Sequence, residues 1–569
     1  MEKNTILAIV LSLVIIIAWN FLYIMPQQKR LEQQKAAQQQ TQTQENSGST
    51  SPVAQTVPVT PNTPAIPIAT APRALREEAQ DVVIETPLLH LTLSTQGARL
   101  TSWKTLAYNG SDGEPVEFVS DDARQRGQFA LEVFTGNAQL DEELNSALYQ
   151  PSETSVKVNP TDEAKTVTLT YATTTAGTFA KEFMFRADSY KVDVTLKFLA
   201  PPADVKSITT VLGPGMGKNL ETVASFMPEI VSTTGIQTKP IRDAAKKIDG
   251  LLTHNNVSWA AMNEKYFTMA FFPASANNTL SINKIALQPK DEKEKIAPIR
   301  EILMGVSQPL EAGKCSLSVY AGPKALKELE HAYQGFERLI DYGTFGFIAA
   351  PLAGFMTYLY AYLKNYGLVI IVLTVLIKIV FYPLTHKSYT SMKKMQDLQP
   401  QMRSLQEKYK NDKQQLNQAM MELYKEKGVN PMGGCLPMLL QMPVFFALYQ
   451  ALSQSIELRG ASFLWIADLS ASETLFFKPL VLLMGVTMFA QQAMTPTTVA
   501  DNRQAQMFKF MPIMFTAMFW NFPAGLVLYW LMNNVLTIGQ QYLINKTGNT
   551  PKTKAKETSD DKPSRRRRK

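Results

Sequence analysis

The sequence has few of the residues that most enzyme and metal sites require. Its 569 residues include two cysteines and four histidines. The cysteines, Cys315 and Cys435, lie in very different segments, so no disulfide framework is expected. The chain has no phosphate-binding glycine loop, no dinucleotide-binding glycine turn and no group of residues with metal-ligand spacing. We therefore expect neither a cofactor nor a metal, and no enzymatic activity.

The N-terminal 78 residues contain a segment without charge, 5–24, followed by a segment with few large apolar residues, 26–78. Residues 5–24 carry no charge and are long enough to cross a bilayer. No small-residue cleavage site follows directly, so we expect residues 1–25 to be an uncleaved transmembrane anchor. Residues 26–78 are rich in Gln, then in Pro, Thr and Ser. Such a segment buries too little surface to offset its ordering entropy, which predicts a disordered linker.

Short runs of alternating apolar and polar residues fill the region 79–335. Examples are residues 89–93, 166–171, 190–196 and 315–320, with Gly, Asn, Asp and Pro between the runs. This pattern predicts antiparallel strands with one buried face, and so many strands predict a large all-β sandwich. Residues 325–340 are expected to form a helix that leads to a membrane.

Long apolar segments dominate the C-terminal half. Residues 345–363 are apolar and aromatic but interrupted by Gly and Pro, which predicts an interfacial helix within 336–365. Five membrane spans are expected within 366–545, at 367–384, 433–455, 475–494, 507–521 and 525–545. With the N-terminal anchor, the predicted total is six transmembrane helices.

Basic residues set the predicted orientation. The loop 386–430 has nine Lys/Arg and five acids, and the tail 546–569 has ten Lys/Arg and three acids. In contrast, residues 456–474 have one Arg and three acids. The positive-inside rule therefore places the loop, the tail and both termini in the cytoplasm and the β domain outside. The basic residues just after the first span disagree locally with this orientation.

A lone cation lies inside the first of the five C-terminal spans. Lys378 costs roughly 2.5–3.5 kcal/mol at the centre of a membrane helix, so it is expected to face water, a partner or a substrate path. Thr374 and Tyr382 lie four residues before and after it, which predicts one polar helix face. The alternative is that Lys378 extends its ammonium group to the nearer membrane surface.

Polar residues recur in the later spans. The candidate groove residues there are Gln441, Thr487, Gln491, Tyr529 and Asn533. Each one alone is better explained by a hydrogen bond between helices. Together with Thr374, Lys378 and Tyr382 they predict a hydrated groove that opens to the cytoplasm and to lipid and is closed on the outer side.

The cytoplasmic loop 386–428 has the periodicity of a helical hairpin. Its candidate substrate contacts are methionines, whose flexible side chains adapt to varied apolar surfaces: Met392, Met395, Met402 and Met420. The alternative is that these methionines form the seam between the two helices. The tail ends in a polycation, Arg565, Arg566, Arg567, Arg568 and Lys569, for which ribosomal RNA and anionic lipid are both plausible partners.

Several short motifs together resemble the YidC/Oxa/Albino family of membrane protein insertases. They are Tyr382-Pro-Leu-Thr385, Tyr389-Thr-Ser-Met392, Asn430-Pro-Met-Gly-Gly-Cys-Leu-Pro437, Leu440-Gln-Met-Pro443, Phe445-Phe-Ala-Leu-Tyr449 and Phe522-Pro-Ala-Gly-Leu-Val-Leu-Tyr529. The resemblance covers nearly the whole chain and is to the Gram-negative form. It implies a cytosol-facing groove, insertion alone or with the Sec translocon, and ribosome contact. It also implies a periplasmic β-supersandwich of galactose-mutarotase-like fold, largely dispensable for insertion.

One groove position departs from the family. The family's cation there is typically Arg, whereas this chain has Lys378, while Gln441 and Tyr529 match without change. Lys keeps the charge but lacks the planar two-pronged guanidinium, which favours a role for charge and hydration over a carboxylate clamp.

The predicted function is therefore the insertion and folding of inner-membrane proteins, with nascent membrane proteins, the Sec translocon, the ribosome and the lipid bilayer as partners. A small-solute transporter is the first alternative, but no inverted repeat is found. A periplasmic carbohydrate-binding protein with a membrane anchor is the second. A sandwich fold alone does not establish that activity.

Overall fold

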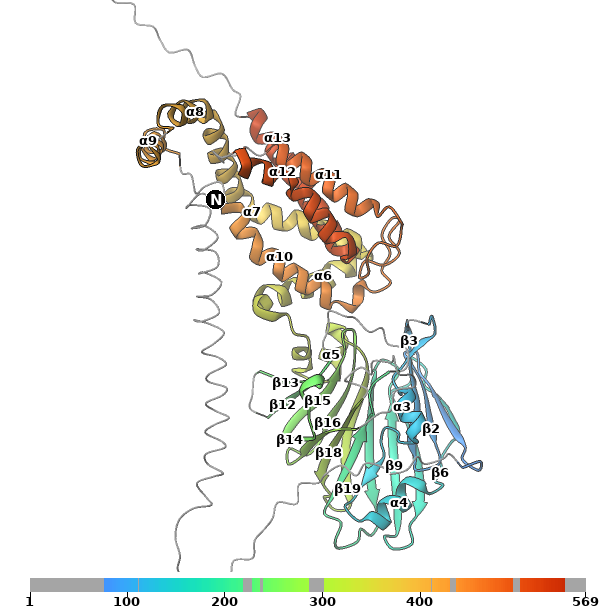
Figure 1. Cartoon of the computed structure of the whole chain (residues 1–569). Coiled ribbons are helices and arrows are strands. Elements are labelled where there is room, and N and C mark those ends of the chain that lie inside the picture. The colour runs from blue at the N-terminus through green and yellow to red at the C-terminus, as the bar shows by residue number, and fades with distance from the viewer. Residues whose placement is uncertain are drawn as a thin grey trace, which may run out of the picture. The chain divides into compact units, whose positions relative to one another are not determined.

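The structure, a computed structural model, describes residues 76–547 apart from residues 111, 218–227, 236–238, 286–300, 411, 430–435 and 495–501. All described residues belong to one compact unit, Pro64–Lys569. The predicted N-terminal anchor, the linker up to residue 75, Cys435 and the basic residues Arg565–Lys569 lie outside the described residues. Figure 1 shows the two described parts, a β-rich domain and a helical core.

The β-rich domain contains three sheets (Figure 1). The first has the order β4 (Pro115–Glu117), β3 (Arg99–Asn109), β2 (Leu89–Ser94), β1 (Asp81–Glu85), β7 (Ser155–Lys157). The second has the order β13 (Ile241–Ala244), β12 (Glu229–Thr234), β15 (Val257–Asn263), β16 (Phe267–Pro273), β19 (Lys314–Pro323), β10 (Lys191–Phe198), β9 (Thr178–Phe185), β8 (Lys165–Ala172), β6 (Gln150–Pro151). The third has the order β14 (Leu251–Asn255), β17 (Thr279–Lys284), β18 (Ile302–Pro309), β11 (Ser207–Leu212), β5 (Val133–Phe134).

Alternation along the strands builds one core between these sheets. In β9 and β10 every second side chain is buried, and the four sequence segments chosen as examples fall in β2, β8, β10 and β19. Buried residues of all three sheets, such as Leu91, Phe183 and Met304, belong to a single hydrophobic cluster. The prediction of a large β domain is therefore confirmed. Two short helices, α3 (Asp121–Arg126) and α4 (Ala138–Ser146), connect strands.

The core of the β domain also encloses charged groups. Lys181 of β9 is fully buried, and its Nζ donates to the carbonyl oxygens of Gly97 (2.8 Å), Ala98 (3.2 Å) and Leu131 (2.8 Å). Burial lowers the pKa of Lys181 to about 7, although the carboxylate of Glu132 opposes this shift. The Lys181 amine thus satisfies three backbone acceptors that the surrounding strands leave without a partner in their ladders.

Replacing this buried amine should unfold the domain more readily. Lys181→Met leaves three buried carbonyls without their donor, so we expect about 2 kcal/mol of lost stability and about 30-fold faster hydrogen exchange in β3 and β9. Lys197→Met in β10 is the control, because Lys197 pairs with Glu182 at the surface, and it should change stability by less than about 0.5 kcal/mol. Equal exchange rates in both variants would contradict a structural role for Lys181.

The predicted helix over 325–340 is wrong in its length. Helix α5 spans only Leu326–Ala332, and a separate 3-10 turn, η4, covers Phe336–Leu339. Tyr333, directly after α5, is extended (φ −163°, ψ 138°), and Gly335 before η4 has φ +89°, so the backbone leaves the helical region between the two elements. The break lets Phe336 turn into the β domain, where it is fully buried against Trp259 and Phe272 (ring centroids 5.0 and 4.9 Å). Burial of one aromatic ring therefore overrides the helical periodicity.

The helical core contains eight helices in the described residues. They are α6 (Gly346–Leu363), α7 (Tyr366–Asp397), α8 (Gln399–Lys408), α9 (Lys413–Glu426), α10 (Leu436–Gln454), α11 (Pro479–Met494), α12 (Asn502–Met518) and α13 (Ala524–Thr547). Helix α13 packs against α7 and α11, α12 packs against α11, and α10 packs against α6. Helix α13 is therefore central to the bundle, and its side chains face several neighbours.

Three of the predicted membrane helices have a boundary that differs by four residues or more, and the first is α12, which begins at Asn502 instead of residue 507. Helix α7 does not end at residue 384 but continues through Pro383 to Asp397, so the first hairpin helix is partly an extension of the span. Helix α11 begins at Pro479 rather than at residue 475, because residues 475–478 form a turn. Pro383 suggested the end of the first span, yet α7 continues through it, whereas α11 begins at a proline, Pro479.

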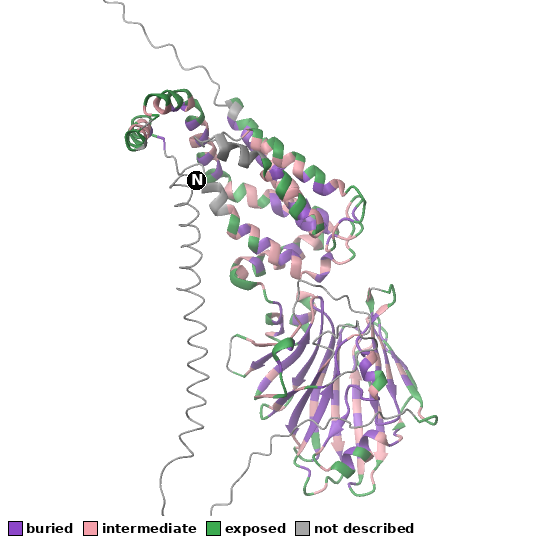
Figure 2. Cartoon of the chain, viewed as in Figure 1, coloured by how far each residue is buried: buried purple, intermediate pink, exposed green. Residues whose placement is uncertain are grey.

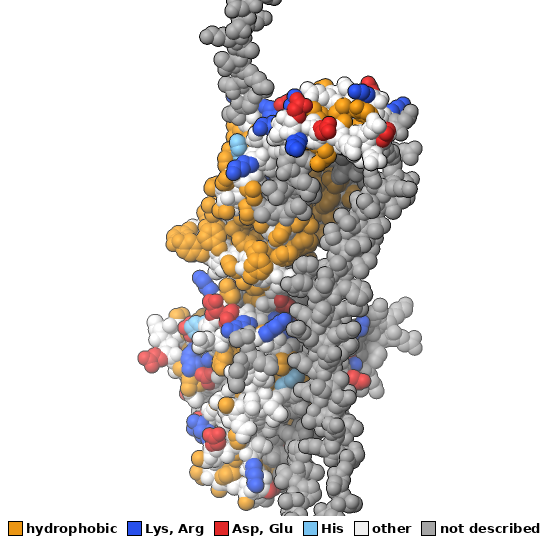
Figure 3. All heavy atoms as spheres, turned by 90° about the vertical axis from the view of Figure 1, so that its left-hand side faces the viewer, with side chains coloured by type: hydrophobic (Ala, Val, Ile, Leu, Met, Phe, Trp, Pro, Cys, Tyr) orange, Lys and Arg blue, Asp and Glu red, His pale blue; other side chains and the backbone are white. Residues whose placement is uncertain are grey.

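Apolar side chains cover much of the outside of the helical core. Large exposed residues include Ile379, Val380, Val486, Phe489, Phe510 and Ile513. Figure 3 shows hydrophobic side chains spread over the helical part, with charged side chains near the hairpin and over the β domain. Figure 2 shows buried residues along the strands of the β domain and exposed residues over much of the hairpin helices α8 and α9. By length and hydropathy alone, two described helices could cross a membrane: residues 343–363 and α7.

Candidate functional site

Lys378 faces α13. Its Nζ donates to the hydroxyl oxygen of Thr537 at 2.8 Å, and the side chain is only partly exposed. Thr537 in turn donates to the carbonyl oxygen of Asn533 one turn earlier (2.7 Å). The cation is thus held by a neutral hydroxyl between two helices. That arrangement differs from the alternative in which Lys378 reaches only toward the membrane surface.

The three residues predicted to share one face of α7, Thr374, Lys378 and Tyr382, do not all face the same surroundings. Thr374 is buried and donates to the carbonyl oxygen of Ile370 (2.6 Å). Tyr382 is 48% exposed and its ring lies 5.7 Å from that of His386. Each step of four residues turns about 40° further around an α-helix, so two steps move Tyr382 about 80° away from Thr374. The structure brings Lys378, but not Tyr382, to the interior of the bundle.

Gln441 and Tyr529 meet between α10 and α13. The Gln441 Nε2 donates to the Tyr529 hydroxyl at 2.6 Å, and Tyr529 is almost fully buried. Next to this pair, the ring of Trp530 lies 4.8 Å from Phe445 and 5.1 Å from Phe519. An aromatic cluster from three helices therefore adjoins the polar contact on the side away from Lys378.

The remaining candidates lie around the α11–α13 contact. Thr487 accepts a hydrogen bond from Nδ2 of Asn534 at 3.2 Å, while Asn533 and Gln491 are half-buried. Sequence reasoning missed Asn534, and it missed Gln540, whose Nε2 donates to the hydroxyl of Thr385 on α7 (2.9 Å). The sequence has adjacent polar residues at 533–534 and 540–541. Steps of four residues from Tyr529 reach only one residue of each pair, 533 and 541.

These contacts converge on α13. Between Tyr529 and Gln540 this helix makes side-chain hydrogen bonds to α10, α7 and α11, a stretch of about 16 Å along its axis. We call the four bonds Gln441–Tyr529, Lys378–Thr537, Asn534–Thr487 and Gln540–Thr385 the polar layer. Each of these four bonds gives a partner to a polar group that hydrocarbon would leave without one.

The four candidate methionines of the predicted hairpin are buried or partly buried. Met392, Met395 and Met402 are buried, and Met420 is partly buried. The Met402 sulfur accepts the Tyr424 hydroxyl at 3.6 Å across the two hairpin helices. Met395, Met402 and Met420 belong to one cluster with Tyr424, as the seam alternative predicts, whereas Met392 lies on α7 outside that cluster.

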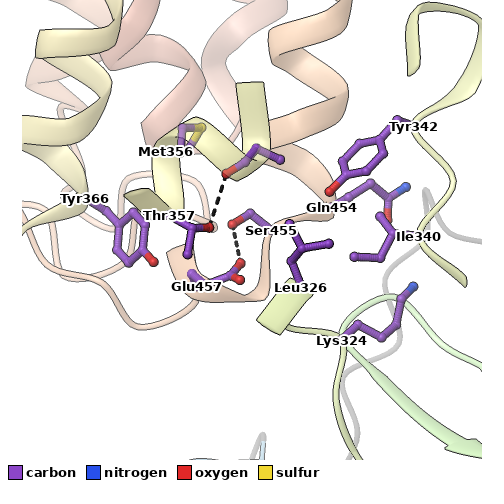
Figure 4. A pocket seen from close by; sticks show the side chains of 11 residues that line it. Lys324, Leu326, Ile340, Tyr342, Met356, Thr357, Tyr366, Gln454, Ser455 and Glu457 are labelled. Atoms are coloured by element: carbon purple, nitrogen blue, oxygen red, sulfur yellow. Dashed lines mark hydrogen bonds between the residues drawn. The ribbon is translucent and has the colours of Figure 1, made fainter. Parts of the chain in front are cut away.

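A small pocket occurs elsewhere in the chain (Figure 4). Its lining includes Lys324, Tyr342, Gln454 and Glu457, and the Glu457 carboxylate accepts the Ser455 hydroxyl at 2.6 Å. The close-up shows aliphatic and aromatic side chains between these polar groups (Figure 4). Within the described ranges, no group of three or more His, Cys, Asp or Glu side chains could hold a metal ion.

Together these features define a helical membrane protein with polar contacts inside its bundle and a β-rich domain attached. Two family models match the chain: "60Kd inner membrane protein" over residues 358–552 and "YidC periplasmic domain" over residues 81–355. The chain is 39% identical to the membrane protein insertase YidC of Geobacter sp. (strain M21) over 485 residues, 82% of this chain and 86% of that protein. It is 35% identical to the corresponding insertase of Geotalea daltonii over 570 residues, 96% and 99% of the two chains.

The chain therefore belongs to the YidC family of membrane protein insertases, which confirms the resemblance seen in its motifs. The family places it in the inner membrane with a periplasmic β domain, and it is not a family of catalytic enzymes. Transport of small solutes and carbohydrate binding are accordingly not favoured.

Two solved structures are similar at low TM-scores. A crystal structure of an active YidC insertase is 18% identical, covers 83% of this chain and 94% of that chain, and has a TM-score of 0.35. A galactose mutarotase-like protein from Lactobacillus casei is 11% identical, covers 42% of this chain and 100% of that chain, and has a TM-score of 0.25. At these scores neither similarity carries an argument about this chain.

The bond between Gln441 and Tyr529 can be measured by a double-mutant cycle. With Gln441→Leu and Tyr529→Phe, we expect a coupling of about 0.6 kcal/mol in the free energy of unfolding in micelles, and at most about 1.7 kcal/mol. Gln441→Leu paired with Thr487→Val is the control, and the effects should add because Thr487 bonds to Asn534 instead. Additive effects in the first pair would show that the contact is not formed.

Proposed function

We propose that this chain inserts membrane proteins by exchanging the bonds of its polar layer for bonds to the incoming polypeptide. A polypeptide entering hydrocarbon leaves its backbone groups unsatisfied until it becomes a helix. Amides, hydroxyls and the Lys378 ammonium part way into the membrane shorten that barrier. The observation that carries this proposal is the polar layer, in which α13 accepts hydrogen bonds from α7 and α10 and donates hydrogen bonds to α11 and α7.

The driving free energy comes from the substrate. Each Leu, Ile, Phe or Val that reaches the membrane centre contributes about 0.3–0.6 kcal/mol, so a hydrophobic segment can leave sideways into lipid without a nucleotide. The bonds of the polar layer are individually worth only about 0.6 kcal/mol, which makes them exchangeable. We infer that the groove residues are Lys378, Gln441, Tyr529 and Thr487, with Thr374, Tyr382, Gln491 and Asn533 around them.

The proposed arrangement in the membrane has six spans. An anchor at 1–25 and a linker at 26–78 precede the β domain at 79–335, a helix at the membrane surface lies within 336–365, and five spans follow in 366–545. Both termini and the hairpin face the cytoplasm, because the basic residues concentrate there. The β domain would be a supersandwich on the periplasmic side.

Further partners follow from charge and position. We infer that the tail 546–569 and the hairpin 386–428 contact the ribosome, since ten Lys/Arg against three acids give the tail a strong attraction for phosphate. Anionic lipid competes for the same cations. Cooperation with the Sec translocon is proposed from the family alone.

Site-specific photocrosslinking tests the route of the substrate. Crosslinkers replacing Lys378, Gln441 or Tyr529 should capture a ribosome-stalled nascent span, because these side chains meet in the polar layer. Val486 on α11 is the matched control: it is 66% exposed on the apolar outside and should capture lipid instead. If none of the three positions captures the nascent span, the polar layer is not the route.

Charge at position 378 can be separated from side-chain shape. Lys378→Arg should keep insertion, whereas Lys378→Leu removes the cation and the bond to Thr537 and should slow insertion of substrates with acidic outer tails about tenfold, or about 1.4 kcal/mol. Lys387→Leu on the exposed side of the same helix should have no effect. Full activity of the Leu variant would reduce Lys378 to a snorkelling residue.

A further inference from the structure

The connection between α10 and α11 forms a structured cap on one end of the helical bundle. We call residues 456–478 the cap loop. The backbone N–H groups of Ala524 and Gly525, at the start of α13, donate to the carbonyl oxygens of Ala471 and Leu469, both at 2.8 Å. The first donors of α13, which have no partner within their own helix, are therefore satisfied by the cap loop.

Close packing fixes the cap loop to two other helices. A Cβ atom at Gly367 of α7 would lie 2.2 Å from the ring of Phe463, so the ring sits directly on the helix backbone. The buried Glu473 carboxylate accepts the Trp465 Nε1 (2.6 Å) and the backbone N–H of Leu480 at the start of α11 (3.0 Å). These contacts leave the inner side of the loop little freedom to move.

The outer rim of the same loop is apolar and has no partner in the described residues. Phe476 is 86% exposed and Phe477 is 72% exposed, and Leu464, Trp465 and Leu475 are also exposed. Glu473 is buried beneath this rim, so no carboxylate of residues 473–477 reaches its surface. A rigid loop thus holds several large apolar side chains outward, at a position where water would oppose their exposure.

We propose that this rim is an interfacial anchor that inserts into the lipid leaflet opposite the hairpin. The rim is continuous along the chain with the exposed apolar side chains of α11, among them Leu482, Leu483 and Val486. Its composition, Trp and Phe beside a lysine, is that of aromatic belts at membrane surfaces. The Lys478 ammonium donates to the carbonyl oxygen of Trp520 (2.7 Å). Its charge is therefore held by the protein and does not require the rim to stay in water.

Lipid fits this rim better than a protein partner does. Its exposed side chains offer no unsatisfied polar group for a specific contact, because the Trp465 N–H is already bonded to Glu473. An anchor here would set the depth of the cap loop, and through Ala524 and Gly525 the depth of the helix that carries the polar layer. This inference rests on the proposed membrane arrangement and adds a lipid contact to it.

Spin labels can measure the depth of the rim. In full-length protein with Cys315→Ser and Cys435→Ser, nitroxides at Phe476→Cys and Phe477→Cys are measured in phosphatidylethanolamine–phosphatidylglycerol vesicles. Both labels should be more accessible to oxygen than to a water-soluble nickel chelate. A label at Glu153→Cys, exposed on the β domain, gives the aqueous reference, and one at Val486→Cys gives the hydrocarbon reference.

A label at Leu475→Cys tests the two rings themselves. Phe476→Ser with Phe477→Ser should shift this label toward the aqueous reference, whereas Leu at both positions should leave it in place because the apolar area is kept. If the rim labels match Glu153 while Val486 stays in hydrocarbon, the anchor is refuted and the membrane arrangement stands. Protection that arises only after adding purified Sec translocon would likewise refute the lipid anchor. An aqueous Val486 label would overturn both proposals.

Discussion

The architecture depends on one requirement, that polar groups inside the membrane helices find partners without water. Helix α13 supplies one member of every bond in the polar layer, and α7, α10 and α11 supply the other. Removing one partner would leave a buried donor or acceptor with its full desolvation penalty. The helices must therefore keep their positions relative to one another. The cap loop helps to fix these positions, because it accepts hydrogen bonds from the first residues of α13 and contacts α7 and α11.

A layer of weak bonds suits the exchange of hydrogen bonds that we propose for this protein. Strong packing alone would hold the helices together but would offer nothing to a polar segment passing between them. Hydrogen bonds worth about 0.6 kcal/mol each can be replaced by bonds to a substrate at almost no net cost. On the side away from Lys378, the cluster of Trp530, Phe445 and Phe519 supplies apolar packing that offers no such exchange. In the proposed mechanism, the hydrogen bonds of the polar layer can be exchanged for bonds to a substrate, whereas the aromatic cluster stays packed.

The sequence predicted the positions of strands and helices better than the side-chain contacts between them. Strand alternation located β2, β8, β10 and β19, because a half-buried sheet imposes a period of two whatever it packs against. The end of α5 at Ala332 could not be predicted, since it depends on Phe336 finding a pocket formed by distant strands. Gln441 and Tyr529, which the sequence suggested, bond to each other. Asn534 and Gln540 were not selected, because one sequence does not tell which member of a polar pair faces a neighbour.

The surroundings of Lys378 suit a lysine at this position. Thr537 offers Lys378 a single hydroxyl oxygen, which a compact ammonium satisfies with one bond. A guanidinium would bring five donors into the same space, and most of them would need water or a substrate carboxylate. An ammonium has three donors, one of which bonds to Thr537, so lysine brings fewer donors that need water or a substrate. In the mechanism that we propose, the Lys378 cation attracts an acidic segment, and charge rather than shape should decide which substrates depend on it.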